Sequence, residues 1–164
     1  SYLYFHNSPS PESFQDECIR LIKDVQYYDV LRGDRTTSSA GLEIRVPFFD
    51  KKFVNEYMSI NPELKVVRDN YEKYLLRKSF ENDLPEEIVW RRKDGFSDGV
   101  SGDSRPWYKI IDEYTKNNFD KTEKQYYRHL FQKYYKGYEY IVPYEWLPKW
   151  CDEENPSGRL VAIS

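Results

Sequence analysis

The sequence predicts a mostly α-helical fold, with no strand long enough to begin a sheet. Apolar residues recur at three- and four-residue spacing in several stretches, and capping residues or prolines stand at their boundaries. Aromatic residues make up 18% of the chain, which favours a folded core although 32% of the residues are charged. The 164 residues contain no internal repeat or linker, so we expect a single domain over residues 1–164.

The first helix is predicted over residues 11–27, because Ser10 can cap it and Pro11 fits its first position. Its apolar positions follow helical spacing: Phe14, Cys18, Leu21, Ile22 and Val25. The side expected to face solvent carries Asp16, Glu17, Arg20 and Lys23.

A second helix is predicted over residues 28–39, where Asp29, Arg32 and Thr36 share one polar face. That face has two interpretations, an ordinary surface ion pair or the wall of a polar pocket. After Gly41, charged and apolar residues alternate over residues 42–46, which predicts a short extended segment. Glu43 and Arg45 could form a buried ion pair, contact a ligand or shape a pocket.

Five more helical stretches follow: residues 51–59 capped by Asp50, 71–80, a short helix begun by Pro85, 106–117, and 122–135 with a capping-box start. The positions expected to face inward are Phe53, Val54, Tyr57, Met58, Tyr71, Leu75, Leu76, Phe80, Trp107, Ile110, Ile111, Tyr114, Tyr126, Leu130, Phe131 and Tyr134. Residues 138–164 are expected to pack as irregular structure.

Residues 90–100 read WRRKDGFSDGV, with three consecutive cations running into a glycine-containing turn. Two interpretations fit, a solvated basic turn or a loop whose cations and backbone N–H groups hold a phosphate-rich ligand. The formal net charge of −3 argues against a general nucleic-acid binder, and no apolar run is long enough to cross a membrane. The distant Cys18 and Cys151 suggest reduced thiols in a cytoplasmic protein, and isolated histidines predict no metal site.

Three motifs carry a resemblance to one family. Residues 42–50 (LEIRVPFFD) resemble the signature LEARVPFLD of glutamine-hydrolysing asparagine synthetases, and residues 90–99 resemble its WRxKxxFSDG pattern. Residues 72–77 (EKYLLR) are similar to its EKxxLR, and shorter counterparts occur at residues 2–6, 148–150 and 156–159. Ile44 and Phe49 depart mildly from the signature, where alanine and leucine are usual.

The family's SGGxDS nucleotide loop, its acidic SGEGSDE segment and its N-terminal cysteine nucleophile do not occur in this sequence. The resemblance therefore implies the helical C-terminal portion of an α/β adenine-nucleotide α-hydrolase-like synthetase domain, lacking the parallel sheet and the ATP loop. The expected partner is an N-terminal glutaminase and ATP-loop portion, in cis or as a separate chain. The fragment could be a split or truncated gene product.

The resemblance implies ATP- and Mg-dependent adenylation of the aspartate side chain, followed by amidation to asparagine with glutamine as donor. Lys93 matches the lysine that contacts the phosphates, a role suited to a mobile ammonium. The implied pocket residues are Asp29, Arg32, Glu43, Arg45, Ser97, Asp98 and Gly99. Two alternatives remain open: a catalytically dead interaction module, and a sister amidotransferase or lactam synthetase acting on another carboxylate.

Overall fold

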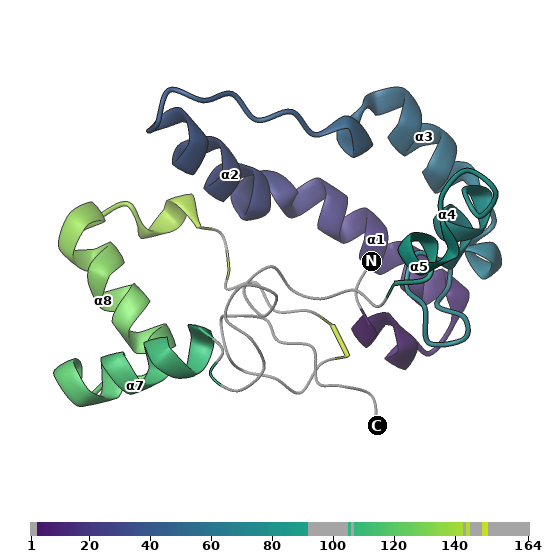
Figure 1. Cartoon of the computed structure of the whole chain (residues 1–164). Coiled ribbons are helices and arrows are strands. Elements are labelled where there is room, and N and C mark those ends of the chain that lie inside the picture. The colour runs from purple at the N-terminus through teal and green to yellow at the C-terminus, as the bar shows by residue number, and fades with distance from the viewer. Residues whose placement is uncertain (1–2, 92–104, 106, 143, 145–148, 151–164) are drawn as a thin grey trace. The chain divides into compact units, whose positions relative to one another are not determined.

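The computed structural model describes residues 3–91, 105, 107–142, 144 and 149–150 (Figure 1). These residues divide into two compact units, which are described separately below. The first holds residues 3–90 with 149–150, and the second holds the described residues from 91 to 144. The described residues form helices and turns without a strand, which confirms the predicted mostly helical class.

The helices of the first unit occur in the following order: η1 (Leu3–Asn7), α1 (Pro11–Asp24), η2 (Val25–Tyr27), α2 (Asp29–Ser38), η3 (Pro47–Phe49), α3 (Lys51–Ser59), η4 (Pro62–Leu64), α4 (Tyr74–Ser79) and α5 (Glu86–Val89). In Figure 1 the chain after α2 runs back alongside that helix to reach α3. Short helices of this kind are stable mainly through what they pack against, so the contacts between them decide the fold.

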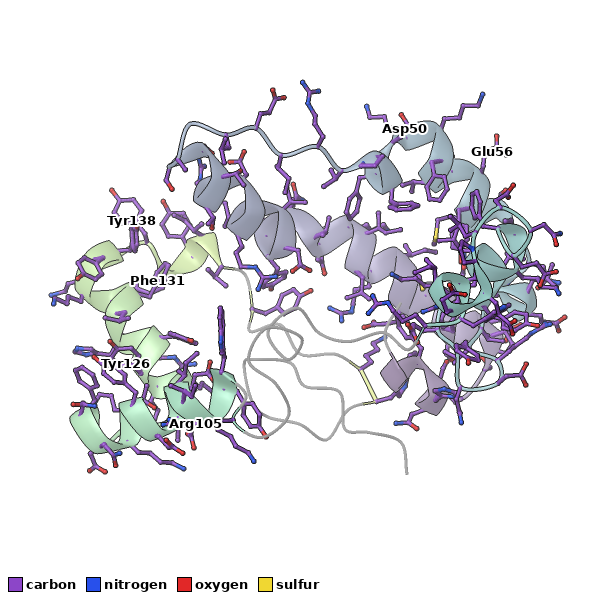
Figure 2. The ribbon with its side chains drawn as sticks, viewed as in Figure 1. Asp50, Glu56, Arg105, Tyr126, Phe131 and Tyr138 are labelled. Atoms are coloured by element: carbon purple, nitrogen blue, oxygen red, sulfur yellow. The ribbon has the colours of Figure 1, made fainter. Side chains whose placement is uncertain are left out.

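The predicted caps of the first and third helices are confirmed. The Ser13 amide donates to Ser10 Oγ at 3.1 Å, and Pro11 occupies the first position of α1. The Asp50 carboxylate, labelled in Figure 2 at the start of α3, accepts from two backbone amides at 3.0 and 3.1 Å. Both caps depend only on neighbouring residues, which is why the sequence predicts them.

Glu17 corrects the predicted solvent-facing side of α1, because its side chain is fully buried. The Arg20 guanidinium donates to both of its carboxylate oxygens at 2.6 and 2.7 Å. Lys149 Nζ lies 3.7 Å from the same carboxylate, and Trp150 packs edge-on to Phe5. Helical periodicity alone assigned this position to solvent, and it gives no sign of the contact with Lys149.

Lys65 joins α1 to the end of α3. It is only 2% exposed, and its ammonium donates to Gln15 Oε1 at 2.7 Å and to the carbonyls of Tyr57 and Met58 at 3.2 Å. Those carbonyls belong to the last turn of α3, where no amide four residues on continues the helix, although the Tyr57 carbonyl also accepts from the Ile60 amide at 3.4 Å. Burial lowers the pKa of Lys65, and the cation serves here as a cap for the helix C-terminus.

Cys18 lies near this contact, and burial raises the pKa of its thiol to about 11 from an ordinary value of 9.0. The protonated thiol therefore stabilises the fold fully below pH 9, and this contribution is lost as the pH rises toward 11. We expect the free energy of unfolding to fall across that window by roughly 2 kcal/mol more than in a Cys18→Ala variant. Urea unfolding of both proteins in a Cys151→Ser background measures the difference, and parallel pH profiles would contradict the prediction.

The helix predicted over residues 71–80 begins later, at Tyr74. Asp69 and Asn70 both have positive φ, and the backbones of Arg68 and Tyr71 exchange two hydrogen bonds across them. This is the geometry of a tight type I′ turn, which holds Tyr71 outside a helix. Lys73 is also left-handed, with φ of 58°, so α4 starts only after it.

The described helices of the second unit are α7 (Trp107–Phe119), α8 (Glu123–Tyr135) and η5 (Glu139–Ile141). Asp120, with φ of 50°, ends α7, and the Lys121 amide closes a Schellman-type bond to the Thr115 carbonyl. The predicted capping box at Thr122 is confirmed by reciprocal bonds with Gln125.

The ring of Tyr126, labelled on α8 in Figure 2, contacts two aromatic rings of α7. Its centroid lies 4.6 Å from that of Phe119 and 6.3 Å from that of Tyr114. These contacts hold the two helices of the second unit together.

Several residues predicted to face inward are exposed: Phe53, Phe80, Trp107, Ile110, Tyr114 and Tyr134. Among the described apolar residues, the buried core consists of Phe5, Phe14 and Val89. Periodicity identified apolar helix faces, but burial also needs a second surface to cover them. Within the described part of the chain those faces remain accessible.

Candidate functional site

Asp29 and Arg32 form an ion pair at the start of α2. Arg32 Nη2 lies 2.5 Å from Asp29 Oδ1, and the Thr36 hydroxyl donates to the Arg32 carbonyl at 2.7 Å. The predicted common face is therefore present. Both side chains are exposed, at 78% for Arg32 and 55% for Asp29, so the pair has the geometry of a surface ion pair. A pocket wall at this face stays a prediction.

Glu43 and Arg45 form a second pair in the connection between α2 and α3. Arg45 Nη2 lies 2.9 Å from Glu43 Oε1, with the side chains 82% and 73% exposed. A buried ion pair is therefore wrong for these residues. Ligand contact and pocket shaping remain as the two other interpretations. Asp29 pairs with Arg32 and Glu43 pairs with Arg45, and within the described residues no ion pair joins the first two residues to the second two.

The signature segment also presents an apolar surface, which we call the 42–49 face. Its members are exposed apolar side chains: Leu42, Ile44, Val46, Phe48 and Phe49. Ile44 reaches back toward α2, where a Cβ added to Gly33 would meet its Cδ1 at 3.3 Å. Leu42 and Phe48 are 65% and 62% exposed. An exposed apolar patch of contiguous residues is typical of a surface that another element covers.

Four predicted site residues, Lys93, Ser97, Asp98 and Gly99, lie outside the described residues. The structure does describe the chain that leads to them, through α5, Trp90 and Arg91. Their predicted roles stay predictions.

The residues that hold α5 were identified in the sequence only as a family motif. Arg77 bonds both the carbonyl and the side chain of Glu72 at 3.0 Å, and its Nη1 donates to the Val89 carbonyl at the end of α5. Glu72 is 3% exposed and the Arg77 side chain 15%. The i,i+5 spacing of glutamate and arginine follows no helical ion-pair rule, so only the folded turn reveals the contact.

Within the described residues, no group of three or more His, Cys, Asp or Glu side chains could hold a metal ion. No helix in the described ranges is both long and apolar enough to pass through a membrane. The described site residues are thus the exposed ion pairs Asp29–Arg32 and Glu43–Arg45. The buried pair Glu72–Arg77 contacts the end of α5.

Together, the fold and these residues define a helical part of a larger domain, with charge pairs and an apolar face open to a further surface. Comparison with known proteins identifies the family of this domain. The family described as Asparagine synthase matches residues 4–150, and the chain belongs to that family. It is 41% identical over 177 aligned positions to the glutamine-hydrolyzing asparagine synthetases of Gallus gallus, Cricetulus griseus and Homo sapiens.

Each of these alignments covers 96% of this chain but 32% of the relative. The chain thus spans about a third of the length of the curated relatives it matches. The family membership predicted from the 42–50, 72–77 and 90–99 motifs is confirmed, as is the partial coverage of the family's domain.

Proposed function

We propose that this chain supplies the C-terminal part of an asparagine synthetase, completing an adenylation site whose other residues belong to a longer or separate polypeptide. One observation carries the proposal: nearly the whole chain aligns with relatives named as glutamine-hydrolyzing asparagine synthetases. The family match over residues 4–150 includes the charged signature at 42–50 and the lysine segment at 90–99.

In the proposed reaction an oxygen of the aspartate side-chain carboxylate attacks the α-phosphorus of ATP, and pyrophosphate leaves. Ammonia derived from glutamine then attacks the acyl carbon, AMP leaves, and a proton is released as the amide forms. Lys93 is the residue of this chain proposed to follow the charge that develops on the phosphates. Asp29, Arg32, Glu43 and Arg45 are proposed to organise the pocket.

The described residues do not by themselves build a site for ATP with Mg. A polyphosphate needs converging cations or backbone N–H groups, and Mg²⁺ needs carboxylate or phosphate oxygens arranged octahedrally. Arg32 and Arg45 are each bonded to a carboxylate of their own pair, and neither pair sits in a described acidic cluster. We therefore assign no step to the metal, and the main nucleotide contacts are proposed to come from the complementing portion.

The 42–49 face supports such a complement. Its apolar side chains are more exposed than is usual on the surface of a complete domain. The aligned part is 32% of the relative, so about two thirds of the relative's sequence lies outside it. We propose that this face packs against the N-terminal portion of the synthetase. The Glu43–Arg45 pair lies within this segment, and the Asp29–Arg32 pair lies on the preceding helix α2.

A second candidate function, a catalytically dead interaction module, is favoured by the same exposed apolar surface. Both functions require a bound partner, and they differ in whether the lysine segment is used for chemistry. Variants of Lys93 in a complemented assembly therefore separate them.

Complementation tests the proposal. We expect the purified chain to release no pyrophosphate from ATP and aspartate, because the nucleotide loop is absent from its sequence. Adding the N-terminal two thirds of a related synthetase, truncated before the aligned region, should restore aspartate-dependent pyrophosphate release and asparagine formation. The truncated relative alone is the control. Activity from this chain alone would contradict its proposed incompleteness, and inactivity of a stable assembly would contradict the synthetase function.

A further inference from the structure

Gly33 lies in the middle of α2, where a glycine weakens a helix relative to alanine. Its lack of a side chain leaves room for a neighbour, because a Cβ added there would meet the Cδ1 atom of Ile44 at 3.3 Å. Two carbon atoms pack best at about 3.5–4.0 Å, so Ile44 occupies the place that a side chain at position 33 would need. We call this the Gly33–Ile44 contact.

The end of α2 directs the chain back toward this contact. Gly41 has a φ of 70°, and two backbone hydrogen bonds close the turn around it. The Leu42 amide donates to the Thr37 carbonyl at 3.0 Å, and this bond spans the whole turn. The Gly41 amide donates to the Ser38 carbonyl at 3.0 Å, which completes a Schellman motif. The chain reverses here, and in Figure 1 the following segment runs back alongside α2.

Gly33 belongs to the face of α2 that carries the first ion pair. It follows Asp29 by four residues, and Thr36 follows Asp29 by seven, so these positions share one side of the helix with Arg32. A residue that contacts Gly33 therefore lies beside the Asp29–Arg32 pair.

Ile44 lies in the middle of the segment that carries the second ion pair, between Glu43 and Arg45. Residues 42–46 form neither helix nor strand, so side-chain contacts have to fix their path. Successive side chains of an extended segment point to opposite sides, so turning Ile44 toward α2 turns its two neighbours away from the helix. The Glu43 and Arg45 side chains are accordingly 73% and 82% exposed. The Gly33–Ile44 contact thus sets the direction in which the second pair faces.

We propose that Gly33 and Ile44 are positioning residues for the candidate site, which fix the place of the Glu43–Arg45 pair relative to the Asp29–Arg32 pair. Gly33 provides the space on α2, and Ile44 holds the extended segment in it. This inference rests on the proposed function, because it gives the four charged residues a pocket to organise.

Nuclear magnetic resonance of the full chain tests the contact without reference to activity. With methyl-labelled isoleucine, the Ile44 δ1 methyl should show a nuclear Overhauser effect to the Gly33 α protons, and Ile44→Val, which deletes that methyl, identifies the signal. Gly33→Leu should shift the amide signals of Glu43 and Arg45, because leucine preserves the helix but fills the space. In an Ile44→Ala chain the same substitution should shift them by about a third as much or less. No Overhauser effect, or equal shifts in both backgrounds, would overturn the inference.

Activity of the complemented assembly tests the positioning role, with the complementing portion in excess because Ile44 also belongs to the 42–49 face. Gly33→Leu should lower kcat/KM for aspartate by about tenfold, since misplacing a site residue by about 1 Å can cost a hundredfold in rate. In an Ile44→Ala assembly the same substitution should cost less than about threefold. An unchanged kcat/KM in Gly33→Leu, or equal losses in both backgrounds, would overturn the positioning role.

Arg35→Leu is the matched control, because position 35 is exposed and lies on the side of α2 opposite Gly33. It adds the same side chain to the same helix and should change kcat/KM by less than about twofold. A loss as large as that of Gly33→Leu would mean that the contact has no special part. An assembly that is inactive even with the original chain would contradict the proposed function and the positioning role with it, while the Overhauser effect would still uphold the Gly33–Ile44 contact.

Discussion

Replacing Lys93 with alanine is expected to slow aspartate-dependent pyrophosphate release by about 10²–10³ in the complemented assembly. An ammonium that stabilises charge developing on the phosphates acts on the transition state, so its loss should appear in kcat and in kcat/KM to the same extent. Steady-state pyrophosphate assays at saturating ATP and aspartate measure the change. The assembly affinity should not change, because the proposed packing surface is the 42–49 face.

Arg92→Ala is the matched control for this prediction, since it removes a neighbouring cation from the same run of charge. If the three consecutive cations act only through their combined positive potential, Lys93→Ala and Arg92→Ala should slow pyrophosphate release by a similar, small factor. Added salt should reduce that factor, because it screens the potential. A Lys93→Ala assembly as active as the original would favour the interaction module over the synthetase. A Lys93→Arg variant tests the further expectation that a compact, flexible ammonium is required and not charge alone.

Replacing Glu17 with glutamine is expected to destabilise the first unit by about 3 kcal/mol. Glutamine keeps the shape of the side chain but removes the negative charge, so the partly buried Arg20 loses its bidentate partner, while its longer contact with Asp24, at 3.9 Å, remains. The nearby Lys149 loses the same charge. Urea unfolding followed by near-UV circular dichroism measures the effect, since the contact between the rings of Phe5 and Trp150, the residue next to Lys149 in sequence, reports the loss of ordered aromatic packing.

Asp16→Asn provides the control, because Asp16 neighbours Glu17 on α1 but is exposed. It removes the same charge and should alter the free energy of unfolding by no more than about 0.5 kcal/mol. Similar values for the two variants would mean that the burial of Glu17 has no energetic importance. A large loss in Glu17→Gln alone would confirm that the buried carboxylate and its cationic partners stabilise the first unit.

Local features of this fold could be predicted from the sequence because their causes are local. Ser10, Asp50 and Thr122 each bond backbone amides two or three residues away, and all three caps were predicted. The late start of α4 was missed, since an Asp-Asn turn with two positive φ values competes with a helical apolar pattern that continues through it.

Long-range features could not be predicted in the same way. Glu17 occupies a polar position by periodicity, and its burial goes with contacts that include Lys149, 132 positions away in the sequence. Glu72 and Arg77 were identified by resemblance, but their bond to Val89 requires a turn that no residue spacing specifies. In the candidate site, the sequence predicted that Asp29 lies beside Arg32 and that Glu43 and Arg45 could pair. The structure shows both pairs and shows that they are exposed. The pocket they are proposed to line is also proposed to include residues of the complementing portion.

The contact between Asn7 and Trp150 has a consequence for the order of events during synthesis. The Asn7 side-chain amide donates to the Trp150 carbonyl at 3.0 Å across 143 positions of sequence. A growing chain can form α1 and its Ser10 cap early, but Glu17 meets Lys149 only once nearly all of this sequence has been translated. Because closing so long a loop is entropically costly and slow, the Glu17 carboxylate of α1 remains without its Lys149 contact until then. Completion of these contacts is therefore a late step in folding, and its rate should depend on how soon residues 149 and 150 become free to return.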